Sequence, residues 1–175
     1  TLEAPPARAD HSMILDAAHD RILLFGGRTG GSLWSYFNDV WELPLGGIPR
    51  WRLFATAGTP PQARSTQATI YDPVRDRMLI FGGIDGSLYL NDTWELSLGD
   101  TPTWTRIDAG SPPPGRADPS AVYDPVSDRM LVFGGSMGST VRYNDVWSLS
   151  MSADPAWSPL GPAGQPPTPR ASHSA

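Results

Sequence analysis

Short apolar or alternating segments recur along the chain between clusters of turn residues, and this pattern predicts many short β-strands. The segment 78–81 is apolar throughout, which is typical of a strand covered on both faces. The side chains of 39–43 instead alternate, with Val40 and Glu42 on one face and Trp41 and Leu43 on the other. In the middle of the sequence the pattern predicts four strands, at 66–72, 77–81, 93–98 and 103–107.

Turn residues separate the predicted strands. The 175 residues include 18 Gly and 19 Pro, which are too many breakers for long helices. Asp-Pro segments at 72–73 and 124–125 join a first strand to a second, and Pro-Pro segments at 60–61 and 112–113 separate successive units. The sequence therefore predicts an all-β fold.

One set of motifs occurs three times. Phe-Gly-Gly stands at 25–27, 81–83 and 133–135. Asn-Asp follows at 38–39, 91–92 and 144–145, with one Trp two residues after each Asp and another ten residues later. The step from Asn38 to Asn91, and from Asn91 to Asn144, is 53 residues, so one unit is used three times.

The repeated residues are expected to build each unit. Glycine pairs allow a positive φ or the close approach of a neighbour, and large rings fill the space between sheets. The Asn-Asp pair is expected to satisfy backbone donors of its loop. These structural residues are Gly26, Gly27, Asp39, Trp41, Trp51, Gly82, Gly83, Asp92, Trp94, Trp104, Gly134, Gly135, Asp145, Trp147 and Trp157.

These motifs resemble kelch repeats, and the period of about 50 residues favours kelch over WD40 units. The motif Tyr-Asp-Pro-Val-x-Asp-Arg-Met, at 71–78 and 123–130, is similar to a motif of bacterial kelch-repeat proteins in particular. The resemblance implies a β-propeller of four-stranded antiparallel blades, each with its first strand innermost. The bacterial likeness favours a secreted or periplasmic location.

The resemblance divides the chain into three blades, at about 8–56, 64–109 and 116–161, before a linker and restarted innermost strand at 166–175. A propeller needs about four to eight blades, so three would leave two apolar faces bare. We therefore expect a homodimer that closes a six-bladed ring. Segment 170–175 duplicates the strand that starts at Arg8, so it either swaps into the partner or packs elsewhere. The alternative is a piece of a longer kelch protein.

Composition excludes several kinds of chemistry. The chain has no Cys, so thiolate nucleophiles and zinc–thiolate sites are excluded, and all 13 basic residues are Arg, which excludes a Schiff-base lysine. A net charge of −5 without a basic patch argues against nucleic-acid binding. Apolar runs of about five residues are too short to span a membrane. No catalytic constellation or cofactor motif is present, which predicts a protein that is no enzyme and needs no cofactor.

The charged residues of the repeat allow structural interpretations. Arg8, Arg64, Arg116 and Arg170 each open a unit, and either pair with the Asp of Asn-Asp or form a ring for an anionic ligand. The Asp pairs 16/20, 72/76 and 124/128 are expected to cap turns, because two carboxylates are too few for calcium. His11 and His173 share a position that is Pro in another copy, so they are expected to be ordinary strand residues. No metal site is predicted.

The parts that differ between copies are the best candidates for function. The loops from double glycine to Asn-Asp differ most, at 28–37, 84–90 and 136–143. Exposed Trp, Tyr and Arg side chains dominate binding hot spots, although Trp34 could instead plug the channel end. The candidate ligand-binding residues are Arg28, Trp34, Tyr36, Asp85, Tyr89, Met137 and Arg142.

The sequence thus predicts a non-catalytic scaffold that presents one propeller face to a protein or peptide. A carbohydrate-binding or carbohydrate-active propeller is the first alternative, because arginines and aromatic residues also suit sugars. Converging carboxylates in a deep pocket would favour sugar chemistry, and a shallow aromatic and arginine surface would favour a peptide. A second alternative is a fragment without a ligand of its own.

Overall fold

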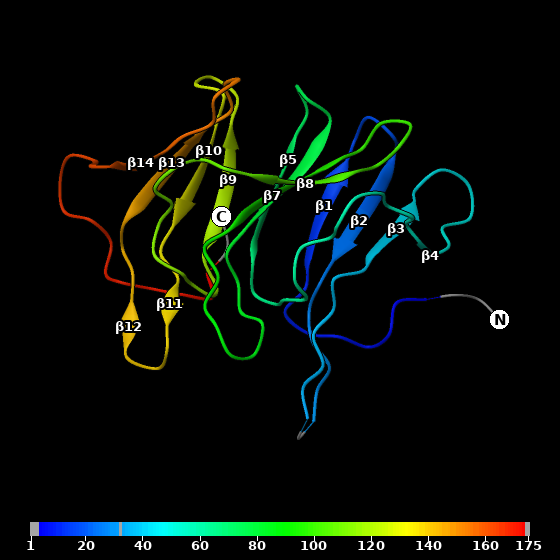
Figure 1. Ribbon diagram of the computed structural model, residues 1–175, viewed down its shortest axis with the longest axis horizontal. Helices are drawn as coiled ribbons and strands as arrows, with labels where there is room; N and C mark the ends of the chain where they lie inside the picture. The colour runs from blue at the N-terminus through cyan, green and yellow to red at the C-terminus, as the bar shows by residue number, and fades with distance from the viewer. Residues whose placement is uncertain (1–3, 32, 174–175) are drawn as a thin grey trace.

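Three four-stranded antiparallel sheets lie side by side in the computed structural model, which describes residues 4–31 and 33–173 (Figure 1). The first sheet contains β1 (Ser12–Asp16), β2 (Arg21–Phe25), β3 (Val40–Pro44) and β4 (Arg52–Leu53). The second contains β5 (Ala68–Asp72), β6 (Arg77–Phe81), β7 (Thr93–Ser97) and β8 (Trp104–Ile107). The third contains β9 (Ser120–Asp124), β10 (Arg129–Phe133), β13 (Val146–Ser150) and β14 (Trp157–Leu160). A small hairpin, β11 (Ser136–Met137) and β12 (Val141–Arg142), follows β10.

The all-β prediction and the four predicted strands of the second unit are confirmed within two residues at each end. Among the described residues no helix is present, and hence none that is long and apolar enough to cross a membrane.

Strand β6 is buried on both faces because a sheet lies on each side of it. Met78 and Ile80 join a core with the first sheet, whereas Leu79 and Phe81 join a core with the third. All four side chains have 0% exposure. This arrangement explains why the segment is apolar throughout rather than alternating.

The second tryptophan of the second and third units packs against the sheet that precedes it. Trp104 lies on Phe25 with ring centroids 5.1 Å apart, and Trp157 lies on Phe81 at 4.8 Å. Both indoles are buried, whereas Trp51, which directly precedes β4 of the first sheet, is only half-buried. The indole is therefore buried where a preceding sheet covers it.

Three of the four repeat arginines pair with the aspartate of an Asn-Asp motif. Arg8 contacts Asp39 at 2.6 Å, and the same pairing recurs for Arg64 with Asp92 and for Arg116 with Asp145. Since these three arginine side chains are at most 3% exposed, the hypothesis that they form a ring for an anionic ligand is wrong. Arg170 differs, because it is exposed and donates to Thr168.

The Asn-Asp motif serves other groups besides the backbone donors that we expected. The second carboxylate oxygen of Asp39 accepts a hydrogen bond from the Trp41 indole at 2.7 Å, as Asp92 and Asp145 do from Trp94 and Trp147. Asn38 donates to the carbonyl of Pro61, and Asn144 donates to that of Pro167. The motif thus binds side-chain donors and a neighbouring carbonyl.

An open series of three backbone hydrogen bonds, here called the inner ring, links the inner ends of the sheets. The residue two positions after each repeat arginine is left-handed, with φ between 54° and 58°. Thr66 N donates to Asp10 O, Asp118 N to Thr66 O, and Ser172 N to Asp118 O. The double glycines lie beside this ring, and a Cβ on Gly26 would be 2.8 Å from the Arg64 carbonyl oxygen. Glycine is therefore required there.

The duplicated segment 170–173 lies on its own chain, beside the third sheet. Gly135 N donates to Arg170 O, as Gly27 N donates to Arg64 O and Gly83 N to Arg116 O. The His173 ring packs edge-on against Phe133 at 5.1 Å. The segment thus holds the position that the start of a further sheet would take, while residues 174–175 lie outside the described residues.

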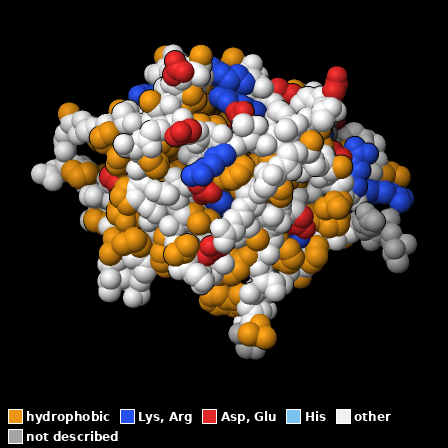
Figure 2. All heavy atoms as spheres, viewed as in Figure 1, with side chains coloured by type: hydrophobic (Ala, Val, Ile, Leu, Met, Phe, Trp, Pro, Cys, Tyr) orange, Lys and Arg blue, Asp and Glu red, His pale blue; other side chains and the backbone are white. Residues whose placement is uncertain are grey.

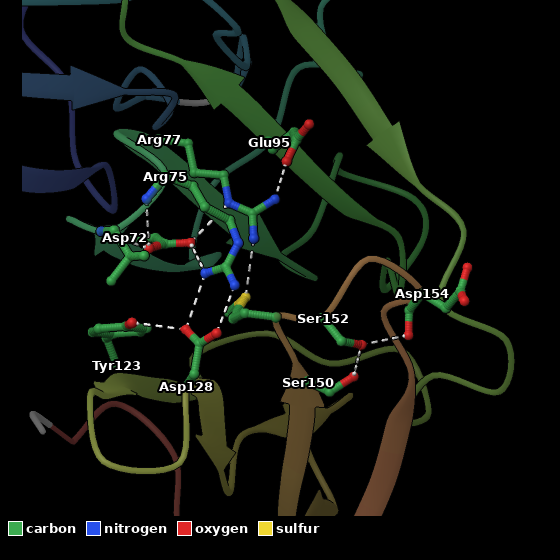
Figure 3. A network of polar contacts seen from close by, with 11 residues as sticks. Asp72, Arg75, Arg77, Glu95, Tyr123, Asp128, Ser150, Ser152 and Asp154 are labelled. Atoms are coloured by element: carbon green, nitrogen blue, oxygen red, sulfur yellow. Dashed lines mark hydrogen bonds and ion pairs between the residues drawn. The ribbon is translucent and has the colours of Figure 1, made fainter.

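The aspartates of the strand-joining turns cap those turns as predicted. Asp72 Oδ1 accepts hydrogen bonds from the backbone of Val74 and Arg75, and Asp124 does the same for its own turn. Figure 3 shows that Arg75 also reaches Asp128 of the next sheet, at 2.5 Å, and that Tyr123 donates to the same carboxylate. These turns therefore also tie neighbouring sheets together.

Candidate functional site

The candidate site is a cavity of about 410 Å³, here called the mouth, where the loops after β2, β6 and β10 meet. The loop after β2 and the β11–β12 hairpin both extend to the lower side of Figure 1. The mouth gathers three aromatic side chains, two arginines and two aspartates, namely Trp34, Tyr36, Tyr89, Arg28, Arg142, Asp10 and Asp118.

Isolated β-bridges position the three loops in the same way. Arg28 bridges both Ala9 and Tyr36, so the first loop folds back along the start of its own unit. Ile84 bridges Ser65 and Tyr89 in the second unit, and Ser136 bridges Ala117 in the third. Because each loop is anchored beside the inner ring, its side chains face a shared central space.

Arg28 connects an aromatic residue to a carboxylate at the mouth. Its Nε donates to Asp10 Oδ2 at 2.7 Å, and its guanidinium lies 4.1 Å from the centre of the Trp34 ring. The Trp34 side chain is 57% exposed and forms an accessible wall of the mouth. Stacking and ion pairing together fix the orientation of this wall.

Tyr36 belongs to the first loop but lies against the second. A Cβ placed on Gly86 would be 2.8 Å from Cε2 of Tyr36, so the ring needs a glycine beneath it. Gly86 has φ +101°, which a side chain would strain as well. This contact joins two loops into one wall of the mouth.

Arg142 and Asp118 make fewer side-chain interactions within the protein than Arg28 and Asp10 do. Arg142 is exposed and donates only to the carbonyls of Gly138 and Val141 in the part of the chain that the structure describes. Burial, together with the charge of Asp10, raises the pKa of Asp118, and weaker contributions from Ser172 and the arginines oppose this. Arg142 and Asp118 thus face the same cavity, and among the described residues no direct ion pair joins these two side chains.

Five of the seven candidate residues from the sequence line the mouth, and Asp85 and Met137 do not. Asp85 organises its own loop, since Oδ1 accepts hydrogen bonds from Ser87 N and Leu88 N and Oδ2 accepts one from Gln62. Met137, on β11, is 43% exposed and is not among the residues that line the cavity.

Asp10 and Asp118 were missed as site residues. Both stand two positions after a repeat arginine, and Thr66 and Ser172 occupy the same position in the other copies. That register was the available signal, because the arginine marks the inner end of each unit. The residue types differ between copies, as expected of a position that faces a ligand rather than a core.

Charged side chains are mixed over the rest of the surface. On the face in Figure 2, arginine and acidic side chains lie interspersed among apolar ones. This distribution agrees with a net charge of −5 that is spread along the chain.

Comparison with known families explains the repeat. The KLHDC2/KLHL20/DRC7 kelch-repeats domain matches residues 1–175, which is the whole sequence. The chain belongs to the kelch-repeat family. Kelch-repeat domains generally mediate protein–protein interactions and are generally non-enzymatic, so the broad prediction of an interaction module holds for this kelch chain.

Three curated relatives are similar over nearly the whole kelch chain, and all are eukaryotic. The flagellar outer arm dynein alpha chain of Chlamydomonas reinhardtii is 33% identical over 99% of the chain and 4% of the relative. Putative adagio-like protein 2 of Oryza sativa subsp. japonica is 31% identical over 97% and 26%. The leucine-zipper-like transcriptional regulator 1 homolog of Drosophila melanogaster is 28% identical over 92% and 16%. The chain thus spans about a quarter or less of these relatives, and the bacterial likeness stays a prediction.

A solved structure, that of YjhT, shares the fold. The TM-score is 0.72 with 17% sequence identity, and the match covers 97% of the kelch chain and 56% of the YjhT chain. At this identity the likeness concerns the fold alone.

Proposed function

We propose that the mouth is a non-catalytic binding site for a protein or peptide segment. The observation that carries the proposal is that five variable-loop residues from three sheets line one open cavity. Trp34, Tyr36 and Tyr89 offer large rigid rings, and Arg28 and Arg142 offer donors, which are the residue types that dominate interface hot spots. The two aspartates add acceptors for donors of the ligand.

The test is selection of peptides from a displayed library, followed by affinity measurement on variants. The variant Trp34→Ala/Tyr36→Ala/Tyr89→Ala should bind the selected peptides with an affinity that is lower by about tenfold or more. The matched control replaces three exposed apolar residues away from the mouth, Ile48, Val74 and Val126, by Ala. Equal affinities for both triple variants would show that the mouth is not the binding site.

A carbohydrate ligand is the second candidate, and the carboxylates of Asp10 and Asp118 favour it. They line the same cavity as the aromatic rings, a combination that also suits sugar hydroxyls. Screening a glycan panel with the same variants separates the two functions. If a sugar binds, if Asp118→Asn abolishes that binding and if no peptide is selected above background, the mouth is a carbohydrate site and the peptide proposal is wrong.

We also propose that each sheet is one propeller blade and that a second copy completes the ring. Met13, Leu15 and Leu53 leave the outer face of the first sheet apolar, with at least 55% exposure each. The corresponding face of the second sheet is covered by the first. Two copies that meet head to tail in both directions would cover both bare faces with the same type of contact.

Segment 170–173 sets a condition on this assembly, since it lies where the partner's first strand would bind. Light scattering should therefore detect a stronger dimer after removal of 166–175 than in the intact sequence. A variant with Leu15→Asp should be monomeric in both forms. If the intact and the truncated chain with Leu15 unchanged are both monomeric, the proposal that two copies close the ring is wrong. If instead the intact chain is a dimer and truncation abolishes that dimer, segment 166–175 exchanges between the two copies.

A further inference from the structure

Strand β8 forms the outer edge of the second sheet, whose strand order is β5-β6-β7-β8. An edge strand leaves backbone N–H and C=O groups free to pair with a further strand. Two cavities of about 360 Å³ and 530 Å³ follow this edge, and Arg106, Ile107 and Asp108 line both of them. We call the two cavities together the edge groove. A hollowed surface thus accompanies an open strand edge.

The chain itself pairs a short extended segment with the start of this edge. Ala57, in the linker between the first two sheets, forms a parallel bridge to Thr103. Its N–H donates to the Pro102 carbonyl at 2.7 Å, and its carbonyl accepts a hydrogen bond from Trp104 N at 3.0 Å. The linker then turns at Gly58, which has φ 76°, and makes no further backbone hydrogen bond to β8 among the described residues. The linker therefore occupies only the start of the edge.

Arg106 carries the next outward-facing backbone groups of the edge. The backbone groups of successive strand residues point to opposite sides, so those of Arg106 face outward as those of Trp104 do. In the ladder Arg106 lies opposite Trp94, and in the described part of the chain its N–H and C=O make no hydrogen bond outside that ladder. Because Arg106 is exposed, one donor and one acceptor of the main chain stand free at the edge groove.

The corresponding edges of the other two sheets are less suited to pairing. Pro159 lies opposite Trp147 as Arg106 lies opposite Trp94, and a proline has no N–H to donate. In the first sheet the edge strand β4 contains only two residues. The second sheet thus offers the most open edge of the three.

The charges of the edge groove balance one another. Arg75 pairs with Asp128, and Arg77 pairs with Glu95. The residues that line both cavities add one arginine and one aspartate. The groove therefore has no excess of either sign that would select a strongly charged ligand.

We propose that the edge groove binds an extended segment of a partner protein, which adds to β8 as a further strand. The main chain of the segment would pair with the N–H and C=O of Arg106, and every second side chain would face the cavities. Ile107, Pro112 and Met151 are among the residues that line them. Uncharged β-branched side chains, which favour an extended backbone, suit such a lining.

A second copy of this chain is the competing occupant. A two-fold contact between two copies would pair the two β8 strands antiparallel, since each strand would meet itself reversed. The pairing that the chain already shows, between Ala57 and Thr103, is parallel. This direction favours a separate segment over a second β8.

The test selects peptides from a displayed library of unstructured sequences on the variant Trp34→Ala/Tyr36→Ala/Tyr89→Ala, so that ligands of the mouth are not recovered. Arg106→Pro, made in that variant, removes the edge N–H and should lower the affinity by about tenfold or more. The matched control Arg106→Ala keeps the N–H and should change the affinity by no more than about twofold. Pro159 shows that the equivalent edge position accepts proline, and melting temperatures check the fold of each variant.

Two measurements on the unsubstituted edge test the main-chain pairing directly. Hydrogen exchange of the Arg106 amide should slow in the complex, whereas exchange of the Ile107 amide, which faces β7, should not change. N-methylation of the bound peptide at one residue after another should abolish binding at every second residue of the paired stretch. A loss at consecutive residues, or none at all, contradicts strand addition.

The inference does not depend on the mouth, because the selection uses a variant that lacks its three aromatic rings. If no peptide is selected, or if Arg106→Ala lowers the affinity as much as Arg106→Pro, the inference is wrong. If the chain forms a dimer that Arg106→Pro abolishes, a second copy occupies the edge and the partner segment is wrong. None of these results changes the proposal for the mouth.

Discussion

Arg64 and Asp92 form a bidentate ion pair, with Nη1–Oδ1 at 2.6 Å and Nη2–Oδ2 at 2.8 Å. The Arg64 side chain is fully buried, and it also donates to the carbonyls of Gln62 and Gly82. One side chain thus joins the loop before the inner strand, the glycine pair after β6 and the start of β7. The pair thus holds the chain next to Ser65 and Thr66, which line the mouth.

Replacing Arg64 by Ala should therefore destabilise the protein strongly. It removes the arginine from the Asp92 carboxylate, which keeps only its Trp94 side-chain donor, and from two carbonyls, and the loss of one partner of a buried pair costs about 3–5 kcal/mol. Arg64→Lys should recover only part of this, because an ammonium cannot reproduce the bidentate geometry. Urea unfolding of the unmodified protein and of both variants measures the free energy of unfolding of each.

Arg170→Ala is the internal control for that experiment. Arg170 occupies the same repeat position but is exposed and donates only to Thr168. Its replacement should change the free energy of unfolding by less than about 0.5 kcal/mol. A comparable loss at both positions would mean that the ion pair is not the source of the effect.

Acid should unfold the protein through these same aspartates. Burial raises the pKa of Asp39, Asp92 and Asp145, but their arginine and tryptophan donors outweigh it, so each pKa is lowered overall. Hydrogen bonds from Arg75 and Tyr123 lower the pKa of Asp128 to about 2. The folded state then binds fewer protons than the unfolded state, so the stability is complete above the ordinary carboxyl pKa, near 4, and is lost as the pH falls toward about 2.

Urea midpoints between pH 7 and pH 2 measure this loss. Asp145→Asn removes one of the carboxyl groups whose pKa is lowered. The variant should therefore be less stable at pH 7, and its urea midpoint should fall less steeply as the pH is lowered. A midpoint that stays constant down to pH 2 in the unmodified protein would contradict the assignment.

Asp118 should behave in the opposite way. Burial and the charge of Asp10 raise its pKa, so the ionised form is less favourable in the folded state than in the unfolded chain. Asp118→Asn should therefore raise the melting temperature at pH 7, and the gain should shrink as the pH falls through the raised pKa of Asp118 and be gone below the ordinary carboxyl pKa. A gain of the same size at pH 7 and pH 3 would show that charge is not its origin.

The strands and the Arg–Asp pairing could be predicted from the sequence because both repeat. Periodicity identified β5 to β8, and the recurrence of Arg64 and Asp92 in register made their pairing one of two hypotheses. The carboxylates of Asp10 and Asp118 could not be predicted as neighbours. They come together across the sheets only because left-handed residues turn the chain toward a common axis.

Asp85 shows a second limit of sequence analysis. It belongs to a variable loop that is rich in binding-type residues, but its carboxylate is used by two backbone amides and Gln62. Such an Asx turn is local and competes directly with ligand binding for the same oxygens. Loop variability alone does not separate these two uses.

Gly86 and Gly31 offer a matched test of the wall that Tyr36 forms. Both have a φ near +100°, so Ala strains the backbone similarly at each, by about 1 kcal/mol or more. A Cβ on Gly86 would meet Tyr36 at 2.8 Å, whereas one on Gly31 meets nothing within 4 Å. Both variants should lose some stability, but only Gly86→Ala should displace the Tyr36 ring and lower the affinity for peptides that bind at the mouth. Titration of one such peptide against both variants checks this, and equal affinities would mean that Tyr36 contributes no binding surface, because strain is common to both changes and displacement of the ring is not.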